Sequence, residues 1–251
     1  MAAEQKNTTS TIKLVDKTLE VLEAFSELND GINLSSLSEK LNMHKSTVYR
    51  LLQVFKQRGY VEQKQKNGKY RLGLAAYRVG QNIVSNMDLL SMARPVMEKL
   101  VREHNETVYL ALPCGQRALM FENIDSLHPV NVMSLKGRHY PLSECAAGDM
   151  LLAFGTTPGE ENLCPPFQED ARLAMLKQQG YSIDADRLGQ GVVSLAVPLL
   201  SAEGVVVGSL CFVGPDFRFT DERLKSRLLL PLVDAGHTVS AKLGYFGYHL
   251  T

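Results

Sequence analysis

The segment from Met43 to Tyr60 constrains the fold of this chain more than any other part of the sequence. Its apolar residues recur at helical spacing and form one stripe, made of Val48, Leu51, Leu52 and Phe55. The other faces carry positive charge and hydrogen-bond donors, and Gly59 predicts the C-terminal end of the helix. Taken alone, the segment fits equally well a solvated surface helix and a helix that reads DNA with its N-terminal half.

The residues before this helix predict two more helices. The apolar positions of the first are Leu14, Val15, Leu19, Leu22 and Phe25, with Val21 and Leu28 near the same face. Ser36 and Glu39 have the spacing of a capping box and predict the start of a second, short helix. Asn42 suits a left-handed turn into the third helix, since asparagine tolerates positive φ. The order helix, helix, short turn, helix is typical of a helix-turn-helix.

A β-hairpin is predicted after the third helix. Residues 60–63 and 70–72 have strand composition, and Asn67-Gly68 between them is a strong hairpin signal. A basic hairpin after a helix-turn-helix makes a winged helix, whose lysines can reach the phosphate backbone. The residues expected to contact DNA are Lys45, Ser46, Thr47, Tyr49 and Arg50 on the helix, and Lys64, Lys66 and Lys69 in the wing.

The distribution of charge supports this interpretation. The chain of 251 residues has 27 basic and 27 acidic side chains, and this zero net charge taken alone argues against a nucleic-acid binder. Between Lys45 and Arg78, however, nine basic residues accompany one acidic residue, Glu62, so the net charge of this segment is +8. A basic module on an acidic body is typical of a DNA-reading domain joined to a domain with another task.

The sequence predicts four parts along the chain. Residues 1–10 are expected to form a disordered polar leader, residues 11–73 the winged helix-turn-helix, residues 74–87 a linker helix and residues 88–251 a second domain. The linker helix is also the expected contact of a homodimer, because symmetric operators are matched by two-fold symmetric proteins. The alternative is that this helix packs only on its own domain.

The second domain is predicted to mix helices and strands. Asp88 is expected to cap a helix in which Pro95 introduces a kink. The predicted strands are residues 107–112, 118–124, 130–134, 192–200 and 205–213. The predicted helices are residues 146–154, 170–179 and 220–243, the last one capped by Thr220. These elements predict an α+β fold with an antiparallel sheet covered by helices.

Other classes of protein receive little support from the sequence. The N-terminus lacks the apolar region of a signal peptide, and no apolar run reaches the roughly 18 to 20 residues of a membrane span, so we expect a soluble, cytoplasmic protein without a membrane partner. The cysteines form no C-x-x-C pair and the histidines lack ligand spacing, so no metal and no cofactor is expected. A thiol enzyme would need Cys145 with His139 or His128, but nothing in their spacing sets up a triad, and we do not expect an enzyme.

Together these segments resemble the IclR family of bacterial transcription regulators, over nearly the whole chain from about Thr11. The fragments that carry the resemblance are Ser46–Leu52, Gly59–Val61, Tyr70–Gly73, Gly137–Leu142, Ala147-Gly148, Gly180–Ser182, Gly191–Pro198 and Val213–Pro215. Each fragment is weak alone, but their order and spacing are highly specific. The resemblance implies a winged helix, a linker helix and a GAF-like effector-binding domain, working as a homodimer or a dimer of dimers on a promoter.

The resemblance also implies a binding site for a small effector. Carried over by position, the family's effector pocket corresponds to Ala146, Ala147, Asp184, Ser194, Cys211 and Val213. Backbone N–H groups at the helix start near Ala146 would suit a carboxylate.

Several positions depart from the family's pattern. Ser194 stands where many members have cysteine, and Cys211 and Val213 replace small hydroxyl residues. Asp149 replaces a basic residue, and the family's pair of acidic residues is missing near Asp186-Arg187, which leaves the charge preference of the site open. The less polar wall favours an aromatic or larger effector over a very small oxoacid.

We therefore expect a ligand-responsive transcription factor that binds double-stranded promoter DNA. The resemblance to the IclR family favours a repressor of a catabolic operon. Effector binding would bias the placement of two winged helices on their half-sites. Two alternatives stay open. One is a DNA-binding oligomer whose second domain senses no ligand, and the other, more remote, is a thiol enzyme.

Overall fold

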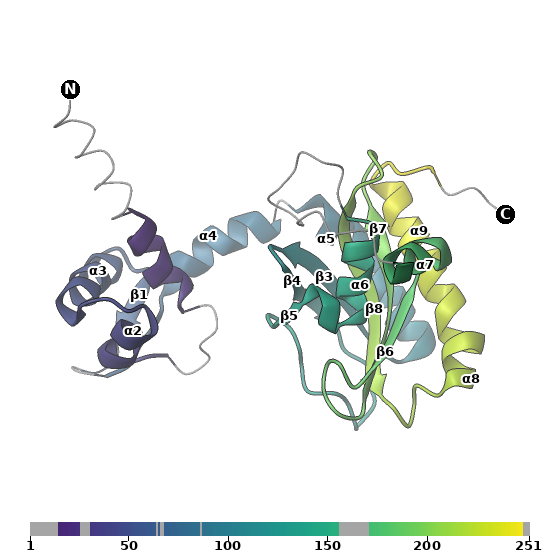
Figure 1. The fold of residues 1–251 in the computed structure, drawn as a ribbon, viewed down its shortest axis with the longest axis horizontal. Helices are drawn as coiled ribbons and strands as arrows, with labels where there is room; N and C mark the ends of the chain where they lie inside the picture. Colours follow the sequence, from purple (N-terminus) through teal and green to yellow (C-terminus); the bar gives the residue numbers. More distant parts are fainter. Residues whose placement is uncertain are drawn as a thin grey trace. The chain divides into compact units, whose positions relative to one another are not determined.

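The computed structural model describes residues 15–25, 31–63, 65, 68–85, 87–155 and 171–247. The chain forms two compact units, Met1–Met87 and Asp88–Thr251 (Figure 1). The leader expected at residues 1–10 lies outside the described part of the chain. Among the described helices, none combines the length and the apolar character that a membrane crossing requires.

The first unit is built from helices and one small hairpin (Figure 1). A helix covers residues 15–23, and it is followed by α2 (Leu34–Lys40), α3 (Lys45–Gln57), β1 (Val61–Gln63), β2 (Tyr70–Leu72) and α4 (Leu74–Ser85). β1 and β2 are antiparallel, and Ile32 adds a bridge to Tyr70. The apolar stripe of α3 packs into the core of this unit through Val48, Leu52 and Phe55.

The turns on either side of α3 are as predicted from the sequence, whereas the start of α2 differs from the prediction. Asn42 has a φ of 49° and Gly59 has a φ of +74°, as predicted for the turn before the helix and for its C-terminal end. The predicted capping box is wrong. The side chain of Asn33 caps α2 by accepting a hydrogen bond from the backbone N–H of Ser36 at 2.9 Å, so Ser36 lies in the first turn of the helix.

The helix at residues 15–23 buries a narrower face than its apolar pattern predicts. Val21 and Phe25 belong to the core of the first unit. Val15 and Leu19 are 55% and 50% exposed, so these two positions do not pack within the described part of the unit.

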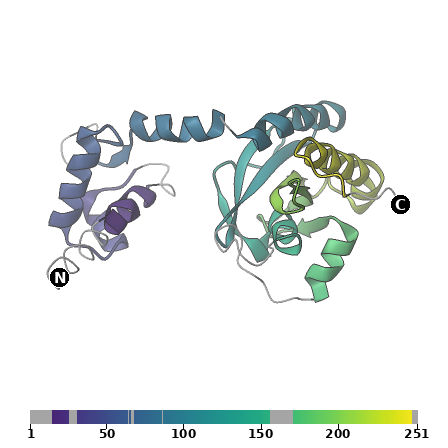
Figure 2. The same cartoon turned by 90° about the horizontal axis from the view of Figure 1, so that it is seen from above.

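The second unit is a six-stranded antiparallel sheet with helices on both faces (Figures 1 and 2). In the order β5-β4-β3-β8-β7-β6, the strands are β5 (His139–Pro141), β4 (Arg117–Ile124), β3 (Thr107–Cys114), β8 (Val206–Pro215), β7 (Val192–Leu200) and β6 (Ser182–Ala185). The helices α5 (Asp88–His104) and α9 (Leu229–Lys242) pack together on one face, and α6 (Ala146–Ala153) and α7 (Ala171–Gln179) lie on the other.

In the second unit one predicted strand is wrong, and two short strands, β5 and β6, were not predicted. Residues 130–134 are irregular, because side chains hold them as a loop: Arg218 donates to the carbonyl of Val130 at 2.5 Å, and Asn131 donates to the carbonyl of His128 at 2.8 Å. β6, which was not predicted as a strand, pairs with β7 so that Asp184 lies opposite Ser194.

The helix ends of this unit are partly as predicted. Asp88 is already the first residue of α5 instead of its N-cap, a shift of one position. Thr220 caps the final helical segment by accepting from the N–H of Arg223 at 3.4 Å, as predicted. That segment contains a π-helical stretch, Leu224–Leu228, before α9.

Candidate DNA-binding and effector-binding sites

The N-terminal half of α3 presents the predicted DNA-binding residues on the side opposite its packed stripe. Lys45, Ser46, Tyr49 and Arg50 are exposed and Thr47 is half-buried. Val48 between them is fully buried in the core of the first unit. A rigid, well-packed helix therefore carries donors and positive charge on its solvent side, which is the arrangement that reads a major groove.

The wing is described only in part. Lys69 is exposed directly before β2, while Lys64 and Lys66 lie outside the described residues. The base of the hairpin is closed by the side chain of Gln63, which donates to the carbonyl of Gly68 at 2.8 Å. The position of Lys69 fits a contact with the phosphate backbone, which requires only charge and reach.

In the second unit, three of the predicted effector-site residues come together around one carboxylate. Asp184 Oδ2 accepts a hydrogen bond from the N–H of Ala146, the first residue of α6, at 2.5 Å, and another from Ser194 Oγ at 2.7 Å. The pairing of β6 with β7 places Ser194 opposite Asp184. The remaining predicted residues, Ala147, Cys211 and Val213, belong with Ala146 to the apolar core between the sheet and α6.

The second oxygen of Asp184 has a different environment. Asp184 Oδ1 is buried and has no hydrogen-bond partner among the described residues. Burial raises the pKa of this carboxyl, while the hydrogen bonds from Ser194 and Ala146 and the charge of Arg187 oppose the rise. A buried acceptor without a donor is uncommon in folded proteins, and such a group often marks a site of function.

A second buried carboxylate, Asp149, is fully neutralised by its neighbours. Arg187 donates to both of its oxygens, at 2.7 and 3.3 Å, and Arg172 donates to Oδ1 at 2.7 Å. Ser182 Oγ donates to Oδ2 at 2.7 Å. Asp149 and Arg187 therefore form a buried ion pair with each other.

Comparison with known proteins decides the family. A model of the IclR helix-turn-helix domain matches residues 14–65, and a model of the C-terminal domain of bacterial IclR transcriptional regulators matches residues 81–241. The chain belongs to the IclR family. It is therefore a DNA-binding transcriptional regulator, and the family and α+β fold predicted from the sequence are confirmed.

Individual relatives of this regulator cover almost its whole length. It is 31% identical to the HTH-type transcriptional regulator KdgR of Escherichia coli, over 95% of both chains. It is 27% identical to XynR of the same species, over 93% of this chain and 98% of XynR. Among solved structures, an IclR transcriptional regulator from Silicibacter sp. TM1040 matches with a TM-score of 0.77 at 25% identity, over 92% of this chain and 96% of that chain.

Cys145, the residue considered for a thiol enzyme, has a structural position in this IclR-family regulator. Its Sγ caps α6 by accepting from the N–H of Gly148 at 3.3 Å. Burial raises the pKa of the Cys145 thiol to about 11, so the thiol is protonated at neutral pH and is a poor nucleophile. Its use as an N-cap gave no signal in the sequence, because cysteine is not among the residues preferred there.

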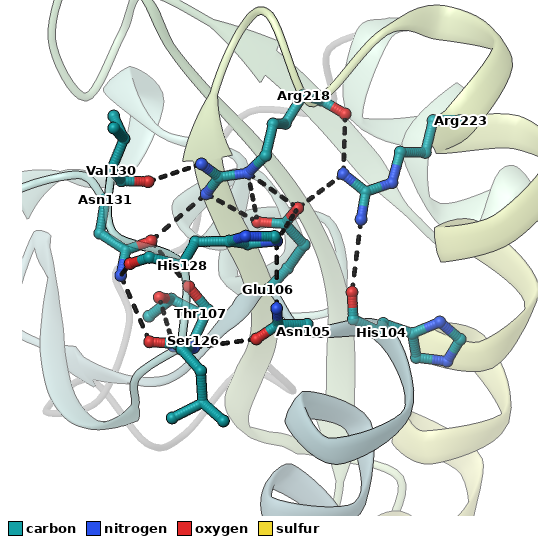
Figure 3. Close-up of polar contacts among 11 residues, drawn as sticks. His104, Asn105, Glu106, Thr107, Ser126, His128, Val130, Asn131, Arg218 and Arg223 are labelled. Atoms are coloured by element: carbon teal, nitrogen blue, oxygen red, sulfur yellow. Dashed lines mark hydrogen bonds and ion pairs between the residues drawn. The ribbon is translucent and has the colours of Figure 1, made fainter.

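A second polar cluster that sequence analysis missed surrounds Glu106 (Figure 3). The buried Glu106 carboxylate accepts from Arg218 at 3.1 Å and from Arg223 at 2.6 Å. His128, which was considered as a base for Cys145, lies in this cluster with its Nε2 3.9 Å from Glu106 Oε1. The cluster holds the start of β3, the loop that contains residues 126–131 and the segment before α8 (Asp221–Arg223) in one arrangement.

Proposed function

We propose that this regulator is a repressor of a catabolic operon and that a small molecule bound in its second unit changes its affinity for promoter DNA. The proposal is based on a cluster of polar groups inside an otherwise apolar core. The cluster consists of Asp184, Ser194 and the N-terminus of α6. Buried polar groups that converge inside an apolar surrounding are typical of small-molecule sites. Residues 88–251 would form the effector-binding domain, and Ala147, Cys211 and Val213 would complete the site.

The proposed DNA contacts divide between two elements. Lys45, Ser46, Thr47, Tyr49 and Arg50 of α3 would enter the major groove, and Lys64, Lys66 and Lys69 of the wing would bind phosphates. The exposed positions on α3 support this assignment. The proposed winged helix-turn-helix spans residues 11–73, and residues 74–87 would serve as the linker helix.

We further propose that the regulator acts as a homodimer, alone or paired into a dimer of dimers, in the cytoplasm where its DNA lies. Support comes from several exposed large apolar residues of the first unit, among them Val15, Leu19, Leu74, Tyr77 and Val79. Two relatives, IclR of Escherichia coli and AllR of Salmonella typhimurium, are named repressors and are 25% and 26% identical to this chain. A more distant structural neighbour from Microbacterium hydrocarbonoxydans, 22% identical, was solved with 4-hydroxybenzoate.

The proposal is tested by fluorescence anisotropy with the purified protein and its own upstream intergenic DNA. The titration is run at two salt concentrations, with and without a panel of carboxylic and hydroxy acids, and scrambled DNA of equal length is the control. Selective binding that one compound weakens would support an effector-responsive repressor. Selective binding that no compound changes would instead support a DNA-binding oligomer that senses no ligand.

A further inference from the structure

The helices α5 and α9 pack side by side on the face of the sheet opposite α6, and together they line a groove of about 340 Å³ (Figure 2). The residues of α5 that line it begin at Val96 and recur three or four positions apart as far as His104, and those of α9 do so from Pro231 to Thr238. Positions with this spacing lie on one face of a helix. The α5–α9 groove is therefore made by two facing helix surfaces, and its volume is in the range of small-molecule sites.

The floor of the α5–α9 groove is apolar. Leu100 and Ala235 are 4% and 6% exposed, and Val96 and Pro231 beside them are partly buried. Apolar side chains of this kind line most small-molecule sites and receive the hydrocarbon body of the ligand.

The rim of the groove carries more negative than positive charge. Glu103 of α5 and Asp234 of α9 supply one carboxylate from each helix, and Lys99 is the one lysine or arginine among the described residues that line the groove. Lys99 Nζ lies 4.0 Å from Glu103 Oε1, and the two side chains are 64% and 50% exposed. An ion pair this long and this exposed is weak, so the Glu103 carboxylate is left largely available to another cation.

His104 adds an acceptor at the C-terminal end of α5. Its ring packs edge-on against Phe212 with the ring centroids 5.9 Å apart, and Figure 3 shows the imidazole turned away from the Glu106 cluster. Burial lowers the pKa of His104, and the charge of Arg223 acts in the same direction, whereas Glu103 opposes them. The imidazole is therefore neutral at neutral pH and keeps one ring nitrogen as an acceptor, and the C-terminal end of a helix also favours positive charge.

We propose that the α5–α9 groove is a second ligand site of this regulator and that it binds a primary amine with an apolar body. The ammonium group pairs with Glu103 and Asp234, and the hydrocarbon part packs on Leu100 and Ala235. An organic anion is excluded, because it would face both carboxylates. The site lies on the other face of the sheet from Asp184, so it does not depend on the effector site of the proposed function.

The test compares probes that share a phenyl body and differ in charge. 2-Phenylethylamine, 2-phenylethanol and 3-phenylpropionate, which are a cation, a neutral compound and an anion at neutral pH, are each titrated into the full-length protein by isothermal calorimetry. The amine should bind at least about threefold more tightly than the alcohol, because exposed ion pairs with two carboxylates together contribute about that much. This preference should shrink as salt is added, and the anion should bind more weakly than the alcohol.

Three variants assign the preference to the groove. In the double variant Glu103→Gln/Asp234→Asn, amides of the same shape replace both carboxylates, so the amine and the alcohol should bind about equally. Glu98→Gln is the matched control, since Glu98 is an exposed acid of the same helix that does not line the groove, and it should keep the preference. Lys99→Met removes the competing cation and keeps an apolar stem, so it should tighten amine binding by about twofold.

Equal binding of the amine and the alcohol by the unmodified protein overturns the proposal, and so does an amine preference that survives in the double variant. Absence of binding by all of the probes rejects the groove as a ligand site. The comparison of probes decides the question in the unmodified protein even if a variant does not fold. The proposed function stands or fails separately, because it is tested by promoter titrations with acids and not with amines.

Discussion

Asp149 shows how a single buried charge depends on its partners. The residue is fully buried and is bound by Arg187, Arg172 and Ser182. Neither arginine would be recognised as its partner from the sequence, because Asp149 lies on α6, Arg172 on α7 and Arg187 in the loop after β6, so their meeting depends on how these segments pack.

Replacing Asp149 by alanine should therefore be strongly destabilising. The variant removes the buried carboxylate that accepts hydrogen bonds from Arg187, Arg172 and Ser182, and breaking a buried pair in this way costs about 3–5 kcal/mol. Urea unfolding followed by circular dichroism measures the loss. Asp125→Ala is the control, because Asp125 is exposed and accepts a hydrogen bond from the exposed side of Asn123, and it should change the free energy of unfolding by less than about 0.5 kcal/mol. Equal losses in the two variants would contradict the role given to Asp149.

The second carboxylate, Asp184, predicts a pH dependence of stability. Its pKa is raised above the ordinary 3.8 by burial, against the opposing effect of its donors. The folded state thus binds this proton more tightly than the unfolded state, so the contribution to stability is full below pH 3.8 and is lost as the pH rises through the raised pKa. The charged groups near it are Arg187 and Asp149, and the titratable thiol of Cys145, which is neutral in this pH range, also lies close.

Because an amide in place of the carboxyl cannot ionise, the Asp184→Asn variant should gain stability relative to the unmodified protein as the pH rises from about 3.5 toward neutral. Urea unfolding at a series of pH values gives the difference in the free energy of unfolding between the two proteins. A difference that stayed constant across the series would mean that the pKa of Asp184 is the same in the folded and unfolded states.

At the scale of elements, short sequence motifs predicted the structure correctly at positions where the backbone has a positive φ. Asn42 was predicted at a left-handed turn and Gly59 at the C-terminal end of a helix, and both are found there with positive φ, which few other residues adopt without strain. Strands were less reliable. Residues 130–134 have strand composition but are held as a loop by Arg218, whereas the short, polar β6 is a strand because β7 offers it a partner. Such outcomes depend on partners distant in sequence.

The close approach of α6 to the turn before it gives a prediction for Gly148. A Cβ at this position would lie 2.1 Å from the carbonyl oxygen of Leu142, and backbone atoms cannot move aside easily. Gly148→Ala should destabilise the protein by about 1–3 kcal/mol or more through overpacking. Gly80→Ala in α4 is the matched control, since a Cβ there meets nothing within 4 Å, and it should be neutral or stabilising by up to about 1 kcal/mol. Thermal unfolding of both variants checks the contrast.

Substitutions in α3 and in the wing should affect DNA binding in different ways. Lys69→Ala should weaken binding to every DNA sequence and reduce the slope of log K against log salt by about 0.9, because one phosphate contact is lost. Arg50→Ala should change the preference among operator variants. Anisotropy titrations on a set of point-substituted operators at several salt concentrations separate these effects, and a salt slope that Lys69→Ala left untouched would remove Lys69 from the DNA interface.

At the scale of the whole molecule, the apolar surface of the first unit predicts an assembly. Tyr77 is 64% exposed on α4, and an aromatic ring so placed is typical of an interface core. Tyr77→Asp should shift the protein from dimer to monomer in light scattering at micromolar concentration and weaken promoter binding. Leu127→Asp serves as the control, because Leu127 is 89% exposed in the second unit and should leave the dimer intact. A Tyr77→Asp protein that remained dimeric would place the dimer contact elsewhere.

The pairing of Asp149 with Arg187 also limits the paths by which such a molecule can have evolved. A relative with a basic residue at position 149 and arginine at position 187 would place like charges side by side in a buried position, and arginine at position 172 would add a third. The exchange of acid and base would have to pass through a neutral intermediate or occur nearly together. Among relatives, the identities of these two positions should therefore change as a pair, and a sequence that carries only one of the changes should also carry a compensating substitution at position 172.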